Sequence, residues 1–127
     1  MSENEIAKTV VDAAFKVHTT LGPGLLESVY EAVMLFELQK RGLTVASQVK
    51  LPIQYESLPI ENALRIDLLV DDKVVVELKA VDLVLPIHKK QLLTYLKLSG
   101  KKLGLMINFN EYFIKDGITR LIQGQLE

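Results

Sequence analysis

The sequence predicts an α/β fold in which helices flank a mixed central sheet, and three observations support that prediction. Apolar residues recur every three or four positions through the first 41 residues and then change to strand spacing. A third helical segment separates the predicted meander from the last strands, so the chain must cross over to a further strand. The length of 127 residues is typical of one domain, and we expect residues 1–127 to form a single domain.

Two helices are expected before the first strand. Ser2 and Glu5 are spaced as a capping box for a helix over residues 3–20. The Gly22-Pro23-Gly24 turn cannot continue that helix. A second helix is expected over residues 25–41, because its apolar residues recur at helical spacing. That apolar stripe consists of Leu26, Val29, Val33 and Phe36.

The next part of the chain predicts a strand and a hairpin. Alternating apolar residues predict a strand over residues 49–55, in which Pro52 indicates a sheet edge or a bulge. Residues 57–62 are expected to form a loop. Residues 64–80 carry two β-rich runs around a turn at residues 71–73, which predicts a hairpin.

The last part of the chain completes the sheet. A third helix is expected over residues 87–98, after Pro86 interrupts the chain. The nearly continuous apolar run over residues 103–109 predicts a strand buried on both faces. A final short strand is expected over residues 117–122. Together these elements predict a mixed sheet with helices packed against its faces.

Composition excludes several kinds of site. The chain has no cysteine, which rules out disulfides, thiolate zinc sites and cysteine nucleophiles, and two histidines are too few for a His-rich metal site. No apolar run approaches the roughly 20 residues of a membrane span. The acidic start of the chain differs from a secretory signal, so we expect a cytoplasmic protein. The net charge of −1 argues against nucleic-acid binding through the field of the whole molecule but leaves local patches open.

The predicted hairpin carries the pattern that points to chemistry. With a three-residue turn Val70 faces Val74, and Asp67 then lies opposite Glu77. Lys79 shares the face of Glu77, because side chains alternate along a strand. A two-residue turn would place the two carboxylates on opposite faces, so the register decides the interpretation.

Two facing carboxylates in an apolar hairpin repel each other and lose hydration. A hard divalent cation such as Mg²⁺ or Mn²⁺ would compensate for both costs, because it binds oxygen and often uses one or two protein carboxylates. The alternative is an ordinary solvent-facing hairpin in which Lys79 and Arg65 neutralise the acids.

Polar residues on two predicted helices could complete such a site. Glu27 and Tyr30 are three residues apart and share a flank of the second helix, and Gln91 and Tyr95 share a face of the third. Each also has a structural interpretation, in which the tyrosines lie at the core boundary with their hydroxyls in water and Gln91 lies on the surface.

Gly24, Glu27 and Tyr30 fit the pattern G-x-x-E-x-x-Y, and with the hairpin they make the chain resemble the GxxExxY proteins of the PD-(D/E)xK nuclease superfamily. The resemblance covers nearly the whole chain. It implies a restriction-endonuclease-like core and a metal-dependent nuclease that hydrolyses phosphodiester bonds. Ile66 stands where the nominal motif of the superfamily has proline.

The resemblance also implies a role for each candidate residue of the site. Asp67 and Glu77 would bind Mg²⁺ or Mn²⁺, helped by the Leu78 carbonyl. Lys79 would position or activate the attacking water, and Glu27 would bind the metal or its water shell. Gln91 and Tyr95 resemble the Q-x-x-x-Y motif of RecB-like nuclease domains, which lies beside the active site.

A run of lysines supports a polyanionic partner. Five lysines and no acid lie between residues 89 and 102, and such lysines would bind the phosphates of nucleic acid, with DNA as the first expectation. The alternative is a solvated helix face. These residues are Lys89, Lys90, Lys97, Lys101 and Lys102.

Two other functional classes stay open. The first is a catalytically silent protein that keeps the nuclease fold and binds nucleic acid or a protein partner. The second is a structural or interaction protein without a nucleic-acid role. A homodimer or a partner chain that supplies specificity is compatible with so small a domain.

Overall fold

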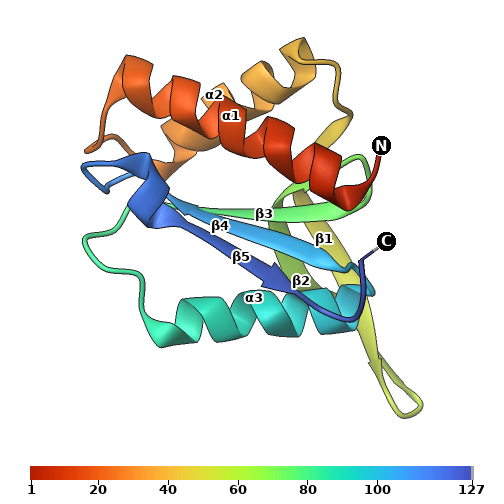
Figure 1. The fold of residues 1–127 in the computed structure, drawn as a ribbon. Helices are drawn as coiled ribbons and strands as arrows, with labels where there is room; N and C mark the ends of the chain where they lie inside the picture. The colour runs from red at the N-terminus through yellow and green to blue at the C-terminus, as the bar shows by residue number, and fades with distance from the viewer. Residues whose placement is uncertain (127) are drawn as a thin grey trace.

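The computed structural model describes residues 1–126, with three α-helices and a five-stranded sheet (Figure 1). The elements follow in the order α1 (Glu3–Leu21), α2 (Glu27–Lys40), β1 (Val45–Tyr55), β2 (Leu58–Val70), β3 (Val74–Lys79), α3 (Pro86–Ser99), β4 (Leu103–Asn108), the 3₁₀ helix η1 (Ile114–Gly117) and β5 (Ile118–Ile122). The sheet order is β1-β2-β3-β4-β5, in which only β3 and β4 are parallel. The predicted α/β fold with a mixed sheet and flanking helices is confirmed.

Two layers of helices cover the sheet. Helices α1 and α2 pack on one face and α3 packs on the other (Figure 1). Each face has its own apolar cluster, and β3 and β4 contribute to both because nearly every residue in them is buried. The predicted strand buried on both faces is therefore confirmed for β4. Among the described residues, no helix has the length and apolar character needed to span a bilayer.

Helix α1 begins with the predicted capping box. The Ser2 Oγ accepts a hydrogen bond from the Glu5 N–H (3.2 Å), and the Glu5 carboxylate accepts one from the Ser2 N–H (3.0 Å). Helix α1 ends at Gly22, whose φ of 75° requires a left-handed backbone that glycine adopts without strain. Helix α2 begins at Glu27, two residues later than the sequence indicates.

The buried face of α2 is not its apolar stripe. Leu26 and Phe36 are 73% and 65% exposed. The side chains that this helix buries are Tyr30, Met34, Glu37 and Leu38. The stripe predicts the helix correctly but not its orientation, because α2 is apolar on more than one face and the tyrosine takes the inward position.

Strands β1 and β2 form a longer hairpin than expected, and its tip extends beyond the C-terminal end of α3 (Figure 1). The predicted loop over residues 57–62 is wrong, because β2 already begins at Leu58. A tight turn at residues 56–57 places Leu58 opposite Tyr55 and Ile60 opposite Ile53. The expectation for Pro52 is confirmed, since β1 is an edge strand and its register shifts between Leu51 and Ile53.

The second hairpin, formed by β2 and β3, has the register expected for a three-residue turn. Its turn occupies residues 71–73, and Val70 pairs with Val74 and Leu68 with Val76. Asp67 and Glu77 are the next positions on the two strands, so they face each other as predicted. After α3, Gly100 ends the helix in the left-handed conformation and the chain returns as β4 parallel to β3.

We predict that Gly117→Ala destabilises the protein by about 1–3 kcal/mol, because the added methyl group would lie 2.4 Å from the backbone oxygen of Asn108. Urea unfolding measures the loss. Gly104→Ala is the matched control, since its methyl group would meet a side chain, that of Leu92 at 3.0 Å, and no backbone atom. Equal losses for the two variants would contradict the explanation by backbone contact.

Candidate active site

Asp67 and Glu77 meet where β2 separates from β3. The regular pairing of the strands ends at Leu68 and Val76, and the side chains supply the next hydrogen bonds. The Asp67 Oδ2 accepts a hydrogen bond from the Leu78 N–H (2.9 Å), and the Glu77 Oε1 accepts one from the Asp67 N–H (3.4 Å). Each residue is only 7% exposed, so the alternative of a solvent-facing hairpin is wrong.

An irregularity in β2 makes this exchange possible. Leu68 belongs to the apolar cluster beneath α1 and α2, whereas Ile66 belongs to the cluster beneath α3. Residues two apart share a face in a regular strand, so β2 must turn over at Asp67. On β1, Gln48 lies opposite with a φ of 51° and outside the regular pairing, so the distortion extends across both strands.

Burial dominates the electrostatics of the pair. Loss of hydration, together with the nearby Asp67 carboxylate, raises the pKa of Glu77 to about 8, while Lys79 opposes the shift. Without a bound cation, the Glu77 carboxyl therefore keeps its proton at neutral pH. A cation that replaced this proton would relieve both the repulsion and the loss of hydration.

Glu27 lies beside the pair, in the first turn of α2. Partial burial raises its pKa, Lys79 and Arg65 lower it and Asp67 raises it, so these charged groups act on one another. Glu27 does not join the two carboxylates in one ligand cluster, because no three Asp, Glu or His side chains in residues 1–126 are close enough to hold an ion together. Its side chain therefore lies near the pair but outside it.

The donor atoms at the pair fit a hard divalent cation. Asp67 and Glu77 offer carboxylate oxygens, and the backbone between Glu77 and Lys79 offers the Leu78 carbonyl. Mg²⁺ is often held by one or two protein carboxylates and keeps several water ligands, so two carboxylates are a sufficient set.

Asn108 fixes the chain after Lys79 and Asn110 fixes the turn before α2, and sequence reasoning missed the role of both. Asn108 is fully buried, and its side-chain amide accepts from the Val81 N–H (3.1 Å) and donates to the Val81 carbonyl (2.8 Å). The Phe109 N–H donates to the Lys79 carbonyl (2.9 Å). The Asn110 Oδ1 accepts from the Gly24 N–H (3.0 Å), which ties the turn before α2 to the end of β4. An asparagine at the end of a buried apolar run was the available signal.

Tyr30 holds the turn that presents Glu27. Its hydroxyl donates to the Gly22 carbonyl (2.6 Å) and accepts from the Leu25 N–H (3.1 Å). Its ring is fully buried and stacks on Phe109 with centroids 4.5 Å apart. The interpretation of Tyr30 as a core-boundary residue with its hydroxyl in water is therefore wrong. Glu27 and Tyr30 are three residues apart. The tyrosine that fixes this turn is therefore close in the helix to the carboxylate that the turn presents.

The remaining predicted residues lie on or after α3. Gln91 is exposed, and Tyr95 is half-buried against the apolar cluster beneath that helix. The five lysines are spread along α3 and the segment that follows it. Lys89 and Lys90 lie in the first two turns of the 14-residue helix, roughly 15 Å before its end. Lys101 follows that end and pairs with Asp72 at 3.1 Å.

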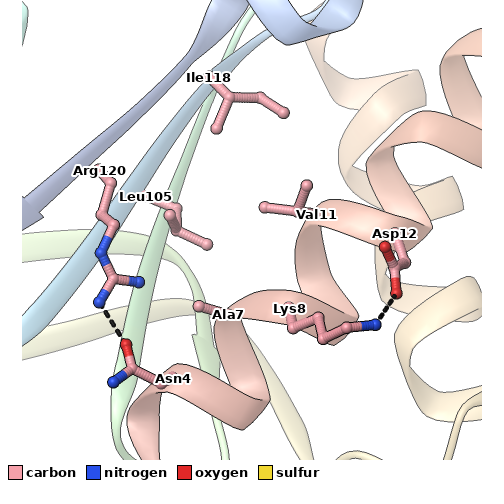
Figure 2. Close-up of a pocket in the computed structure, with 8 residues that line it drawn as sticks. All are labelled: Asn4, Ala7, Lys8, Val11, Asp12, Leu105, Ile118 and Arg120. Carbon is pink, nitrogen blue, oxygen red and sulfur yellow. Dashed lines mark hydrogen bonds and ion pairs between the residues drawn. The ribbon is translucent and has the colours of Figure 1, made fainter.

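A separate pocket lies between α1 and the strands β4 and β5 (Figure 2). Its polar side chains pair with one another, since Lys8 bonds Asp12 at 3.2 Å and Arg120 bonds Asn4. Its apolar lining comes from α1, β4 and β5 (Figure 2). None of the predicted site residues lines this pocket, so it is not the place where the carboxylates act.

Comparison with known proteins gives one match. A family model described as the PD-(D/E)XK nuclease superfamily matches residues 4–121, which is nearly all of the chain. No curated protein and no solved structure matches it significantly. The match includes the hairpin with Asp67, Glu77 and Lys79, and it includes the turn and helix with Glu27.

We predict that Glu77→Gln stabilises the metal-free protein at alkaline pH. The pKa of Glu77 rises from its usual 4.5 to about 8 on folding, so folding favours the protonated carboxyl. The stability from this group is present below about pH 4.5 and is lost as the pH rises toward about 8. At about pH 9 in chelator, the free energy of unfolding of the variant should exceed that of wild type by roughly 2–4 kcal/mol.

Urea unfolding in chelator from about pH 5 to about pH 9 measures this difference. Glu61→Gln is the control, because Glu61 is exposed on β2 and should leave the pH dependence unchanged. A wild-type stability that falls no more steeply with pH than that of Glu77→Gln would contradict the assigned cost of ionising Glu77.

We predict that Tyr30→Phe lowers the free energy of unfolding by about 1–3 kcal/mol, because the Gly22 carbonyl and the Leu25 N–H lose their buried partner while the stacked ring remains. Chemical unfolding measures the loss. Tyr112→Phe removes the same hydroxyl from a side chain that is 80% exposed and should cost nothing measurable. Similar values for the two variants would show that the buried hydroxyl does not hold the turn.

Proposed function

The chain belongs to the PD-(D/E)XK nuclease superfamily, and on that premise we propose that it is a metal-dependent nuclease that hydrolyses phosphodiester bonds in nucleic acid. The observation that carries the proposal is the buried pair of Asp67 and Glu77. A hairpin made mostly of Val and Leu keeps two facing carboxylates at a cost in hydration and repulsion, which a divalent cation offsets.

In this proposal Asp67, Glu77 and the Leu78 carbonyl hold Mg²⁺ or Mn²⁺. The bound ion supplies Lewis-acid chemistry, in that it polarises a phosphate oxygen and lowers the pKa of a water ligand. The backbone N–H groups of Asp67 and Leu78 fix the carboxylates before any ligand arrives, so binding the ion needs little rearrangement.

The other residues act on water and substrate. Lys79 ends β3 next to Glu77, where its ammonium group positions the attacking water and stabilises negative charge at the phosphate. Glu27 reaches the water shell of the ion from the start of α2, which agrees with its place outside the carboxylate pair. Gln91 and Tyr95 support the geometry of the site or contact the substrate from α3.

Three narrower assignments belong to the same proposal. The pattern of Gly24, Glu27 and Tyr30 supports the GxxExxY group within the superfamily. DNA is the first substrate to test. A chain without cysteine is compatible with the reducing cytoplasm, where we propose that the protein acts.

A second candidate is a catalytically silent protein that binds nucleic acid or a protein partner. The observation that favours it is the absence, within residues 1–126, of a third carboxylate close enough to complete a metal cluster. The two candidates differ in their dependence on metal, because a nuclease loses activity in chelator and a binder keeps its affinity.

The decisive experiment incubates the purified protein with single-stranded DNA, double-stranded DNA and RNA, with Mg²⁺, Mn²⁺ or EDTA. We expect metal-dependent cleavage that falls by about 10²–10³-fold in Lys79→Ala, because a positioned charge at the reacting phosphate is removed. Lys40→Ala removes the same charge from an exposed position at the end of α2 and should cut as well as wild type.

Thermal unfolding of both lysine variants shows whether the fold is intact. Cleavage by Lys79→Ala at the wild-type rate would overturn the role assigned to that residue. Absence of cleavage on every polymer, with nucleic acid still bound in EDTA, would instead favour the second candidate.

A further inference from the structure

Lys50 and Arg65 face each other across the β1–β2 hairpin. They are register partners in the antiparallel ladder, and both side chains are exposed. Like charges placed directly opposite each other on a sheet repel. Neither side chain forms an ion pair with any carboxylate in residues 1–126. The hairpin therefore keeps two facing cations that form no ion pair in the described part of the chain.

The two cations lie on the side of the sheet that carries α2. Val49, Leu51 and Ile66 pack into the apolar cluster beneath α3, and alternation along each strand turns Lys50 and Arg65 toward the opposite face. A hydrogen bond of 2.6 Å from Gln48 Nε2 to Glu31 Oε1 joins β1 to α2 two residues before Lys50.

Arg65 is close enough to Glu27 to act on its charge. The Arg65 guanidinium lowers the pKa of Glu27, which lies in the first turn of α2 beside the buried pair. Arg65 is also two residues from Asp67 on the same strand. The hairpin thus runs from the candidate active site to an exposed pair of positive charges without an intervening element.

We propose that Lys50 and Arg65 form a phosphate-binding pair that holds the backbone of a nucleic acid beside the active site. This inference rests on the proposed function for its ligand class and adds the surface along which the substrate lies. An arginine can bind one phosphate through two parallel hydrogen bonds, and a lysine adds a point charge on the same or the next phosphate. The pair does not distinguish one base sequence from another, because the phosphates of a nucleic acid are the same at every position.

This assignment moves the expected contact surface away from α3. The lysines after residue 88 are spread along a helix and its end, and one of them already pairs with Asp72. Lys50 and Arg65 form no ion pair among the described residues, and Arg65 is two residues from Asp67 on β2.

The test measures binding and cleavage separately. Binding of a short fluorescein-labelled DNA duplex and single strand is followed by anisotropy in EDTA, between about 50 and 200 mM salt. We expect Lys50→Gln and Arg65→Gln each to weaken binding roughly tenfold at the lowest salt, and the double variant to lower the slope of log affinity against log salt by about 1.8 on the duplex. The double variant Lys8→Gln/Lys40→Gln removes the same charge from α1 and α2 and should bind like wild type.

The unfolding temperature of the free protein separates a binding role from a structural one. The hairpin variants remove a repulsion and should melt no earlier than wild type. A lower unfolding temperature together with weaker binding would assign the loss to the fold and overturn the proposal.

Cleavage assays on the same variants separate this inference from the proposed function. A protein that cuts with metal, and whose hairpin variants bind and cut like wild type, keeps its nuclease function and loses the phosphate pair. A protein that cuts nothing, but whose hairpin variants no longer bind, keeps the phosphate pair and loses the nuclease function. Loss of binding in Lys97→Gln/Lys102→Gln but not in the hairpin variants would return the contact surface to α3 and overturn the proposal.

Discussion

At Asp67 the backbone hydrogen bonding between two strands gives way to hydrogen bonds made by carboxylates. The Leu78 N–H, which the sheet would otherwise leave without a partner as the strands separate, donates to Asp67, and the Asp67 N–H donates to Glu77. Buried backbone donors need acceptors, and at this opening of the sheet two carboxylates accept in place of backbone carbonyls. The burial of the two carboxyl groups and the raised pKa of Glu77 both depend on that exchange.

The rest of the fold holds this opening in place. Strands β3 and β4 are parallel, so Lys79 and Asn108 lie side by side at one end of the sheet. From that end Asn108 fixes the chain after β3, and Asn110 and Tyr30 fix the turn before α2. Three segments far apart in the sequence are therefore held together by side chains that bond to backbone atoms.

The sequence predicts well what depends on local spacing. The three-residue turn at residues 71–73 determines the register, and the register places Asp67 opposite Glu77. The burial of the pair was not predictable, because it follows from a distortion of β2 that involves Gln48 on another strand. The lysines after residue 88 are spread along α3 and the segment after it, since each helical residue advances by about 1.5 Å. The loop expected at residues 57–62 failed because the turn needs only two residues.

The hydrogen bond between Gly24 and Asn110 joins positions 86 residues apart. Glu27 cannot be held in its final orientation until the segment after β4 is present, because that segment supplies both Asn110 and the ring of Phe109 beneath Tyr30. During synthesis on the ribosome the acidic residues emerge before their anchor, and the candidate site cannot be organised until Phe109 and Asn110 have also emerged.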